Sequence, residues 1–153
     1  MFRRLFAVQN GEMVVRLDES IRELLNSVSE ELREVLLVSD ADMTRRLYPT
    51  AYPNDEKLNS EYQEMVHDQL LMQRLDGIDT LQETINDATI TLDAADAWMS
   101  TINQVRLVLG TRLDVSEDSH EIDEDDPNAQ HLVIYQVLSH VLEELTRART
   151  SAL

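Results

Sequence analysis

The side chains best suited to chemistry are Glu64 and His67, which form a Glu-x-x-His motif within a predicted helix. This spacing places a carboxylate and an imidazole on one helix face, as in carboxylate-bridged di-metal sites of helical bundles. A second copy, Glu117 to His120, lies in an acidic segment that is not predicted to be helical. The two further inward-facing glutamates that such a site needs are not found at apolar-stripe positions. We therefore interpret the motif as a chance pairing, and expect no metal and no cofactor.

The acidic segment itself, residues 114–128, could in principle hold calcium, because Ca²⁺ prefers clustered carboxylate oxygens. An EF-hand loop also needs a central glycine, and no glycine follows Gly110. We predict a solvated loop, because a block of like charges repels itself. The segment contains eight acidic residues and no Lys or Arg: Asp114, Glu117, Asp118, Glu121, Asp123, Glu124, Asp125 and Asp126.

Other catalytic arrangements are not indicated. His131 and His140 lie nine residues apart in a predicted helix, which turns them to opposite faces. No serine stands in a Gly-x-Ser-x-Gly motif, and three glycines leave no phosphate-binding loop. The chain has no cysteine, which excludes disulfides, cysteine-bound metals and thiol switches. We expect no catalytic residues and a protein that is not an enzyme. A carboxylate–histidine metal enzyme is the remote alternative, and it requires Glu64 and His67.

The net charge of −17 repels phosphate and so disfavours nucleic acid as a partner. Arginines nevertheless gather locally, and we expect most of them to pair with the surplus acidic residues. The alternative is a direct DNA-binding regulator whose affinity falls with salt. That affinity would be lost when Arg3 and Arg4, or Arg45 and Arg46, are changed to Ala.

The elements that would position these residues begin with a β-hairpin within residues 1–17. Asn10 and Gly11 supply the two positive-φ positions of a type I′ turn between residues 2–8 and 12–17. Residues 88–92 are β-branched and predict a short third strand beside the hairpin, which would be marginal alone.

Four helices are predicted from three- and four-residue apolar spacing. Asp18 caps the first, over residues 19–38. The second runs from about 56 to 86, with Asp55 as its cap and Gly77 favouring a kink or break. The expected inward residues of the second helix are Leu58, Tyr62, Met65, Val66, Leu70, Leu75, Ile78, Leu81 and Ile85.

The third and fourth helices are identified in the same way. Asp93 and Asp96 resemble a capping box that starts the third helix, which runs to Leu113. Asp126 and Pro127 are typical of a helix start, and open a last helix that ends near residue 147. The last helix's inward stripe is Leu132, Val133, Val137, Leu138, Val141, Leu142 and Leu145.

Together these elements predict an α+β fold that is mainly α, with the hairpin, a third short strand and about four principal helices around one core. We expect residues 1–153 to form a single domain, with a helical core at 18–113, the acidic loop at 114–128 and a C-terminal helix at 129–153. No apolar run approaches the ~20 residues of a membrane span, and the N-terminus lacks the features of a signal peptide. We therefore expect a cytoplasmic protein that does not bind membranes.

Two stretches carry a family resemblance. They are Leu47-Tyr48-Pro49-Thr50-Ala51-Tyr52-Pro53-Asn54-Asp55 and residues 98–113, which include Arg-Leu-Val-Leu-Gly-Thr-Arg-Leu. They resemble the signature stretches of an actinobacterial family, long catalogued as a domain of unknown function and named for the oxidative stress transcriptional regulator AosR. The resemblance covers nearly the whole chain. It implies an actinobacterial cytoplasmic protein, often encoded near the ClpS adaptor, and it carries over no catalytic residue.

The expected function is that of a non-enzymatic regulatory or protein-interaction module of this AosR-like kind. Tyr48, Tyr52, Arg106 and Arg112 are the candidate partner-binding residues, because tyrosine and arginine are common anchors at interfaces. The alternative for Arg106 and Arg112 is pairing with acidic residues of neighbouring helices. We expect a protein partner, and the strand edges of the hairpin would also allow a homodimer.

Overall fold

The computed structural model describes residues 4–38, 56–113 and 129–153, without the side chains of residues 56–60, 63, 64, 112 and 113. These parts form four helices and a three-stranded antiparallel sheet, so the α+β, mainly α prediction is confirmed. The predicted acidic loop and the predicted caps at Asp55, Asp126 and Pro127 lie outside the described residues.

The sheet forms as the sequence predicts. Strands β1 (Phe6–Gln9) and β2 (Glu12–Val15) pair so that Gln9 faces Glu12 across a two-residue turn. Asn10 and Gly11 adopt φ angles of 54° and 78°, which are the positive values that a type I′ turn requires. Strand β3 (Thr89–Thr91) pairs antiparallel with β2, which confirms the third strand and gives the order β1-β2-β3.

Helix α1 (Glu19–Val38) has the predicted bounds, and its N-terminus is capped by Asp18, whose Oδ1 accepts a hydrogen bond from the Ile21 N–H at 2.9 Å. Helix α3 (Glu56–Thr84) continues through Gly77, so the helix does not break there. An ideal Cβ at Gly77 would lie 3.2 Å from Thr101 Oγ1. The missing side chain therefore allows close helix packing, while the helix itself stays continuous.

Helix α4 (Leu92–Leu113) ends as predicted but is capped differently. Thr91 Oγ1 accepts the Ala94 N–H at 3.0 Å, so the capping box predicted at Asp93 and Asp96 is wrong. Asp96 instead forms an ion pair with Arg149, with Nε 2.8 Å from Oδ1. Helix α5 (Ala129–Thr150) extends three residues beyond the predicted end.

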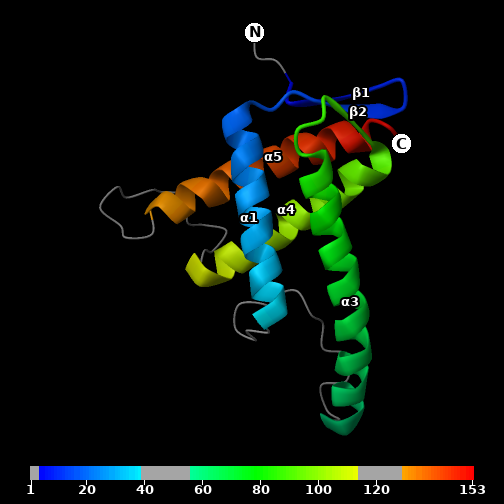
Figure 1. Ribbon diagram of the computed structural model, residues 1–153, viewed down its shortest axis with the longest axis vertical. Coiled ribbons are helices and arrows are strands. Elements are labelled where there is room, and N and C mark those ends of the chain that lie inside the picture. The colour runs from blue at the N-terminus through cyan, green and yellow to red at the C-terminus, as the bar shows by residue number, and fades with distance from the viewer. Residues whose placement is uncertain (1–3, 39–55, 114–128) are drawn as a thin grey trace.

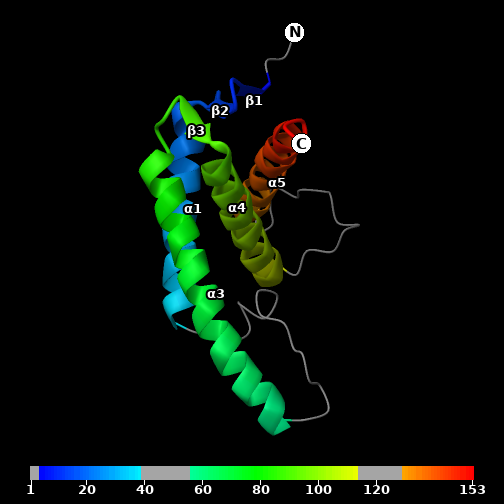
Figure 2. The ribbon, with the colours of Figure 1, turned by 90° about the vertical axis from the view of Figure 1, so that its right-hand side faces the viewer.

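Figures 1 and 2 show how the elements are layered. Helices α1 and α3 lie side by side, α4 packs behind them, and α5 packs on the far side of α4. The sheet covers the end where α1 begins and α3 finishes. The lower half of α3 extends well past the end of α1 (Figure 1).

The core is centred on Trp98 of α4, which is fully buried. Its ring meets Phe6 of β1 edge to face, with ring centres 6.5 Å apart. Its Nε1–H donates to Thr84 Oγ1 on α3 at 2.8 Å, so the buried indole is satisfied. One side chain thus joins the sheet, α3 and α4.

Candidate interaction surface

The four partner-binding residues predicted from the sequence are only partly described. Tyr48 and Tyr52 lie outside the described residues. Arg112 belongs to α4, but its side chain is not described. Their predicted joint surface with Arg106 therefore stays a prediction.

Arg106 contacts an aromatic residue of the neighbouring helix. Its guanidinium carbon lies 5.4 Å from the centre of the Tyr135 ring on α5, which is a cation–π distance. Its Nη2 lies 3.4 Å from the Tyr135 hydroxyl, and Nη1 lies 3.4 Å from Asn103 Oδ1. The acidic partner expected for Arg106 is thus replaced by tyrosine. The contact links α4 to α5.

Three other arginines pair with carboxylates, as expected of a chain rich in acidic residues. Arg4 Nη1 lies 3.7 Å from Glu144 Oε2, and Arg147 pairs with the same carboxylate. Arg149 pairs with Asp96. The guanidinium groups of these three arginines are thus paired with carboxylates within the chain.

The Glu-x-x-His motif cannot be assembled from the described side chains, because that of Glu64 is not among them. His67 lies half-buried on α3. Across 4–38, 56–113 and 129–153, no group of three or more His, Asp or Glu side chains could hold a metal ion. The second motif, at Glu117 and His120, lies outside these ranges.

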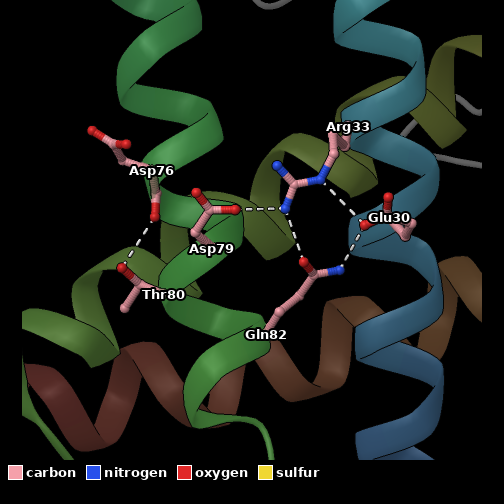
Figure 3. Close-up of polar contacts among 6 residues, drawn as sticks. All are labelled: Glu30, Arg33, Asp76, Asp79, Thr80 and Gln82. Atoms are coloured by element: carbon pink, nitrogen blue, oxygen red, sulfur yellow. Dashed lines mark hydrogen bonds and ion pairs between the residues drawn. The ribbon is translucent and has the colours of Figure 1, made fainter.

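A polar clamp joins α1 to α3 (Figure 3). Arg33 Nη2 lies 2.7 Å from Asp79 Oδ1 and 2.8 Å from Gln82 Oε1, so one nitrogen donates to two side chains of α3. Glu30 Oε2 accepts from Arg33 Nε at 3.2 Å and from Gln82 Nε2 at 2.9 Å. The ring of contacts joins the two antiparallel helices at this level.

The clamp also shifts the pKa values of Glu30 and Arg33. Hydrogen bonds from Gln82 and Arg33 hold the pKa of Glu30 below its ordinary value of 4.5. The hydrogen bond to Asp79 raises the pKa of Arg33 above its ordinary value. Both shifts favour the charged forms of Glu30 and Arg33, the forms that make these contacts.

Helix α3 also presents a stripe of exposed residues that combines carboxylates with methionines and includes Asp79 of the clamp. Its members follow one another at steps of three and four residues, so they lie on one face of the helix. Two are methionines, and the other five are acidic. We call this set the α3 stripe: Glu61, Met65, Asp68, Met72, Asp76, Asp79 and Glu83.

Exposure of the two methionines is unusually high for large apolar side chains. Met65 is 60% exposed and Met72 68%. On α1, Leu37 and Val38 at the helix end are 59% and 75% exposed. Among the described residues the large exposed hydrophobics further include only Val133 and Leu153. Exposed apolar surface thus concentrates on α1 and α3.

The α1 side of this surface is also acidic. Glu34 and Leu37 follow Glu30 at steps of four and three residues, so they share its face, and all three are exposed. Glu30 and Asp79 both bind Arg33, which places this edge of α1 next to the α3 stripe. Figure 3 shows Asp79 and Gln82 reaching toward α1 while Asp76 points away from it.

Sequence reasoning placed Met65 on the inward face of α3, and this is wrong. Apolar residues of α3 are fully buried only from Ile78 onward in the described part of the chain. Met65 precedes Ile78 by 13 residues, which turns it about 140° around the helix from that buried residue and onto the exposed face of Asp76 and Asp79. The helical period of 3.6 residues, applied strictly along α3, contained the signal.

Residues 3–149 match a family described as a domain of unknown function, DUF2017. The chain belongs to this family. No curated protein and no solved structure matches it. Within the described ranges of this DUF2017 chain, none of the helices combines the length and apolar character needed to cross a bilayer.

Two hollows lie among the described elements, away from the α3 stripe. A cavity of about 60 Å³ lies between α1, α4 and α5, with Leu32, Val108 and His131 in its wall; a cavity of this size suits water, not a cofactor. A groove of about 520 Å³ lies between the β2–α1 connection and α5. Arg16 and Asp18 give its rim both signs of charge, so its polar groups select no single ligand chemistry.

Proposed function

We propose that this DUF2017 protein is a non-enzymatic regulatory module that acts by binding a protein partner through the α3 stripe and the adjoining edge of α1. The exposure of Met65 and Met72 on an otherwise acidic helix face carries the proposal. Exposed apolar side chains rimmed by polar groups are typical of protein-binding sites, and methionine is common at adaptable ones.

The clamp supports this proposal by ordering the end of the surface that contains Asp79. Arg33 holds Asp79 of the α3 stripe, and Glu30 holds both Arg33 and Gln82. A surface that is ordered before binding loses less conformational entropy on association. The α1–α3 pair therefore offers a preformed face, as an interaction module needs.

The resemblance to AosR-type oxidative stress regulators supports a role in transcription, in the cytoplasm of an actinobacterium. The chain has no cysteine, so no thiol of this protein senses oxidants. We therefore propose regulation through the partner, with the DUF2017 chain as the recognition element.

Site-specific photocrosslinking in the native cells tests the proposed function. A photoreactive amino acid replaces Met72 in one strain and Glu143, an exposed residue of α5, in a control strain. We expect one reproducible protein adduct from position 72 that is absent from position 143. The proposal is overturned if both positions give the same adducts, or if position 72 gives none.

A further inference from the structure

We propose that the partner presents a basic, amphipathic helix to the α3 stripe. This inference rests on the proposed function and specifies the chemistry of the occupant. Three features of the described residues support it, namely the sign of the charges, the spacing of the methionines and the like charge that a second copy would bring.

Charge selects the class of partner. Every charged member of the α3 stripe is acidic, and Glu30 and Glu34 extend the same sign onto α1. Arg33, which lies between the two helices, is already bound to Asp79 and Glu30. The surface therefore attracts Lys and Arg, and a net charge of −17 steers such a partner toward the chain.

The methionine spacing selects the shape of the partner. Met65 and Met72 are seven residues apart on a continuous helix, which places them about 10.5 Å apart along the axis. A second helix repeats its apolar positions at the same interval. An extended strand repeats one face about every 6.7 Å, so no multiple of its period matches 10.5 Å. The spacing thus favours a helix.

The same charges disfavour the other occupants. In a symmetric pair of chains, Asp68 and Asp76 of one copy would face carboxylates of the other. Nucleic acid and anionic membranes would bring phosphate against them. Of these occupants, only a partner helix with Lys or Arg beside its apolar positions complements the charge of the α3 stripe.

The test uses the full chain and a 21-residue probe peptide made of three Leu-Lys-Lys-Leu-Leu-Lys-Leu repeats. A second peptide carries Glu at every Lys position, and a third alternates Leu and Lys so that it suits a strand. We expect the helical basic peptide to bind more tightly than either control, as measured by calorimetry at physiological salt.

Matched variants separate specific binding from general attraction to an acidic protein. M65Q/M72Q removes the apolar part of the stripe, and D68N/D76N removes two of its charges. Each is expected to weaken peptide binding by about tenfold, the effect of losing central contacts of an interface.

The matched control variants lie away from the α3 stripe. E12Q/E143Q changes the net charge by the same amount as D68N/D76N, and V133Q/L153Q removes other exposed apolar side chains. Both are expected to change the affinity less than about twofold, because their sites lie outside the interface. Circular dichroism of each variant verifies that the helices are retained.

Each result decides the inference. Equal loss of binding in the stripe variants and the control variants overturns it, because the peptide is then attracted only by the total charge. Self-association that is abolished by M65Q/M72Q overturns it in favour of a second copy. If the peptide does not bind while position 72 still crosslinks a protein, the helix inference fails and the proposed function stands; if crosslinking also fails, both are lost.

Discussion

Arg33 Nη2 on α1 lies 2.7 Å from Asp79 Oδ1 on α3, so these two residues stand level with each other in the antiparallel helix pair. In this register α1 ends at Val38 while α3 continues toward Glu56. As a result, about 27 Å of α3 extends past the end of α1. Met65 and Met72 are exposed because they lie on the outer face of α3, the face that Asp76 and Asp79 continue alongside α1.

Removing the arginine of the clamp is expected to weaken the α1–α3 contact. Arg33→Ala leaves Asp79 and Glu30 without their cation, and we expect a loss of about 1 kcal/mol in the free energy of unfolding, at the upper end for a partly exposed network. Urea denaturation measures it. Glu23→Ala, at an exposed position of the same helix, is the control; an equal effect of both changes would show that the clamp contributes nothing.

The clamp should also appear in the pH dependence of stability. The pKa of Glu30 is lowered by its hydrogen bonds to Gln82 and Arg33, so its contribution is fully present above the ordinary carboxyl pKa of 4.5. It is lost as the pH falls through the lowered, folded-state pKa. We expect Glu30→Gln to be less stable than the parent chain at neutral pH, with the difference shrinking in acid. A difference that stays constant down to about pH 3 contradicts this account.

Arg22 is expected to matter more for stability than any member of the clamp. Its guanidinium donates to backbone carbonyls of Val15, Leu17, Ile85 and Asp87 at 2.6–3.2 Å, joining β2, the start of α1 and the α3–β3 connection.

Arg22→Ala leaves these carbonyls without their donor, and we expect unfolding in urea to become easier by about 2–3 kcal/mol. Arg22→Lys should recover only part of the loss, because an ammonium lacks the planar fork. Full recovery by lysine would show that charge alone, and not the geometry of the guanidinium, is what stabilises this junction.

The close approach of α3 and α4 at Gly77 predicts that Gly77→Ala destabilises the parent chain but stabilises a variant without the neighbouring hydroxyl. Gly77→Ala gains about 1 kcal/mol in helix propensity, but its Cβ would lie 3.2 Å from Thr101 Oγ1, a fully buried atom. We expect net destabilisation, because overpacking typically costs about 1–3 kcal/mol.

In a Thr101→Ala background the obstructing oxygen is absent, and the same Gly77→Ala change should become stabilising. Thermal denaturation of the four proteins of this double-mutant cycle measures the coupling. Identical effects of Gly77→Ala in the two backgrounds would mean that Thr101 does not limit the packing.

Much of the fold could be predicted because its signals are local. Asn10-Gly11 determines the turn, and Asp18 determines where α1 begins, because both depend on a few neighbouring residues. Apolar spacing located α4 and α5 for the same reason. Two caps compete at the start of α4, because Thr91 and Asp93 are both acceptable N-caps, and strand β3 ending at Thr91 selects the first.

The surface could not be predicted from spacing alone. Steps of three and four residues lead from Met65 to Ile78, yet only Ile78 is buried. Over these 13 residues such steps drift by about 140° around the helix, so the two side chains lie on different faces of α3. The packing of α1 and α4 against α3 selects the face that carries Ile78. The pairing of Arg106 with Tyr135, and not with a carboxylate, likewise depends on the packing of α4 against α5.

Methionine methyl resonances offer the most direct test of the central claim, that the α3 stripe is a partner-binding face. The chain has six methionines, which include Met65 and Met72 on the stripe and Met13 in the core. The protein, labelled with ¹³C at the methionine methyl groups, is titrated with the basic helical peptide. The account predicts that the signals of Met65 and Met72 shift together and saturate while that of Met13 stays fixed. Saturable binding that leaves Met65 and Met72 unchanged would contradict it.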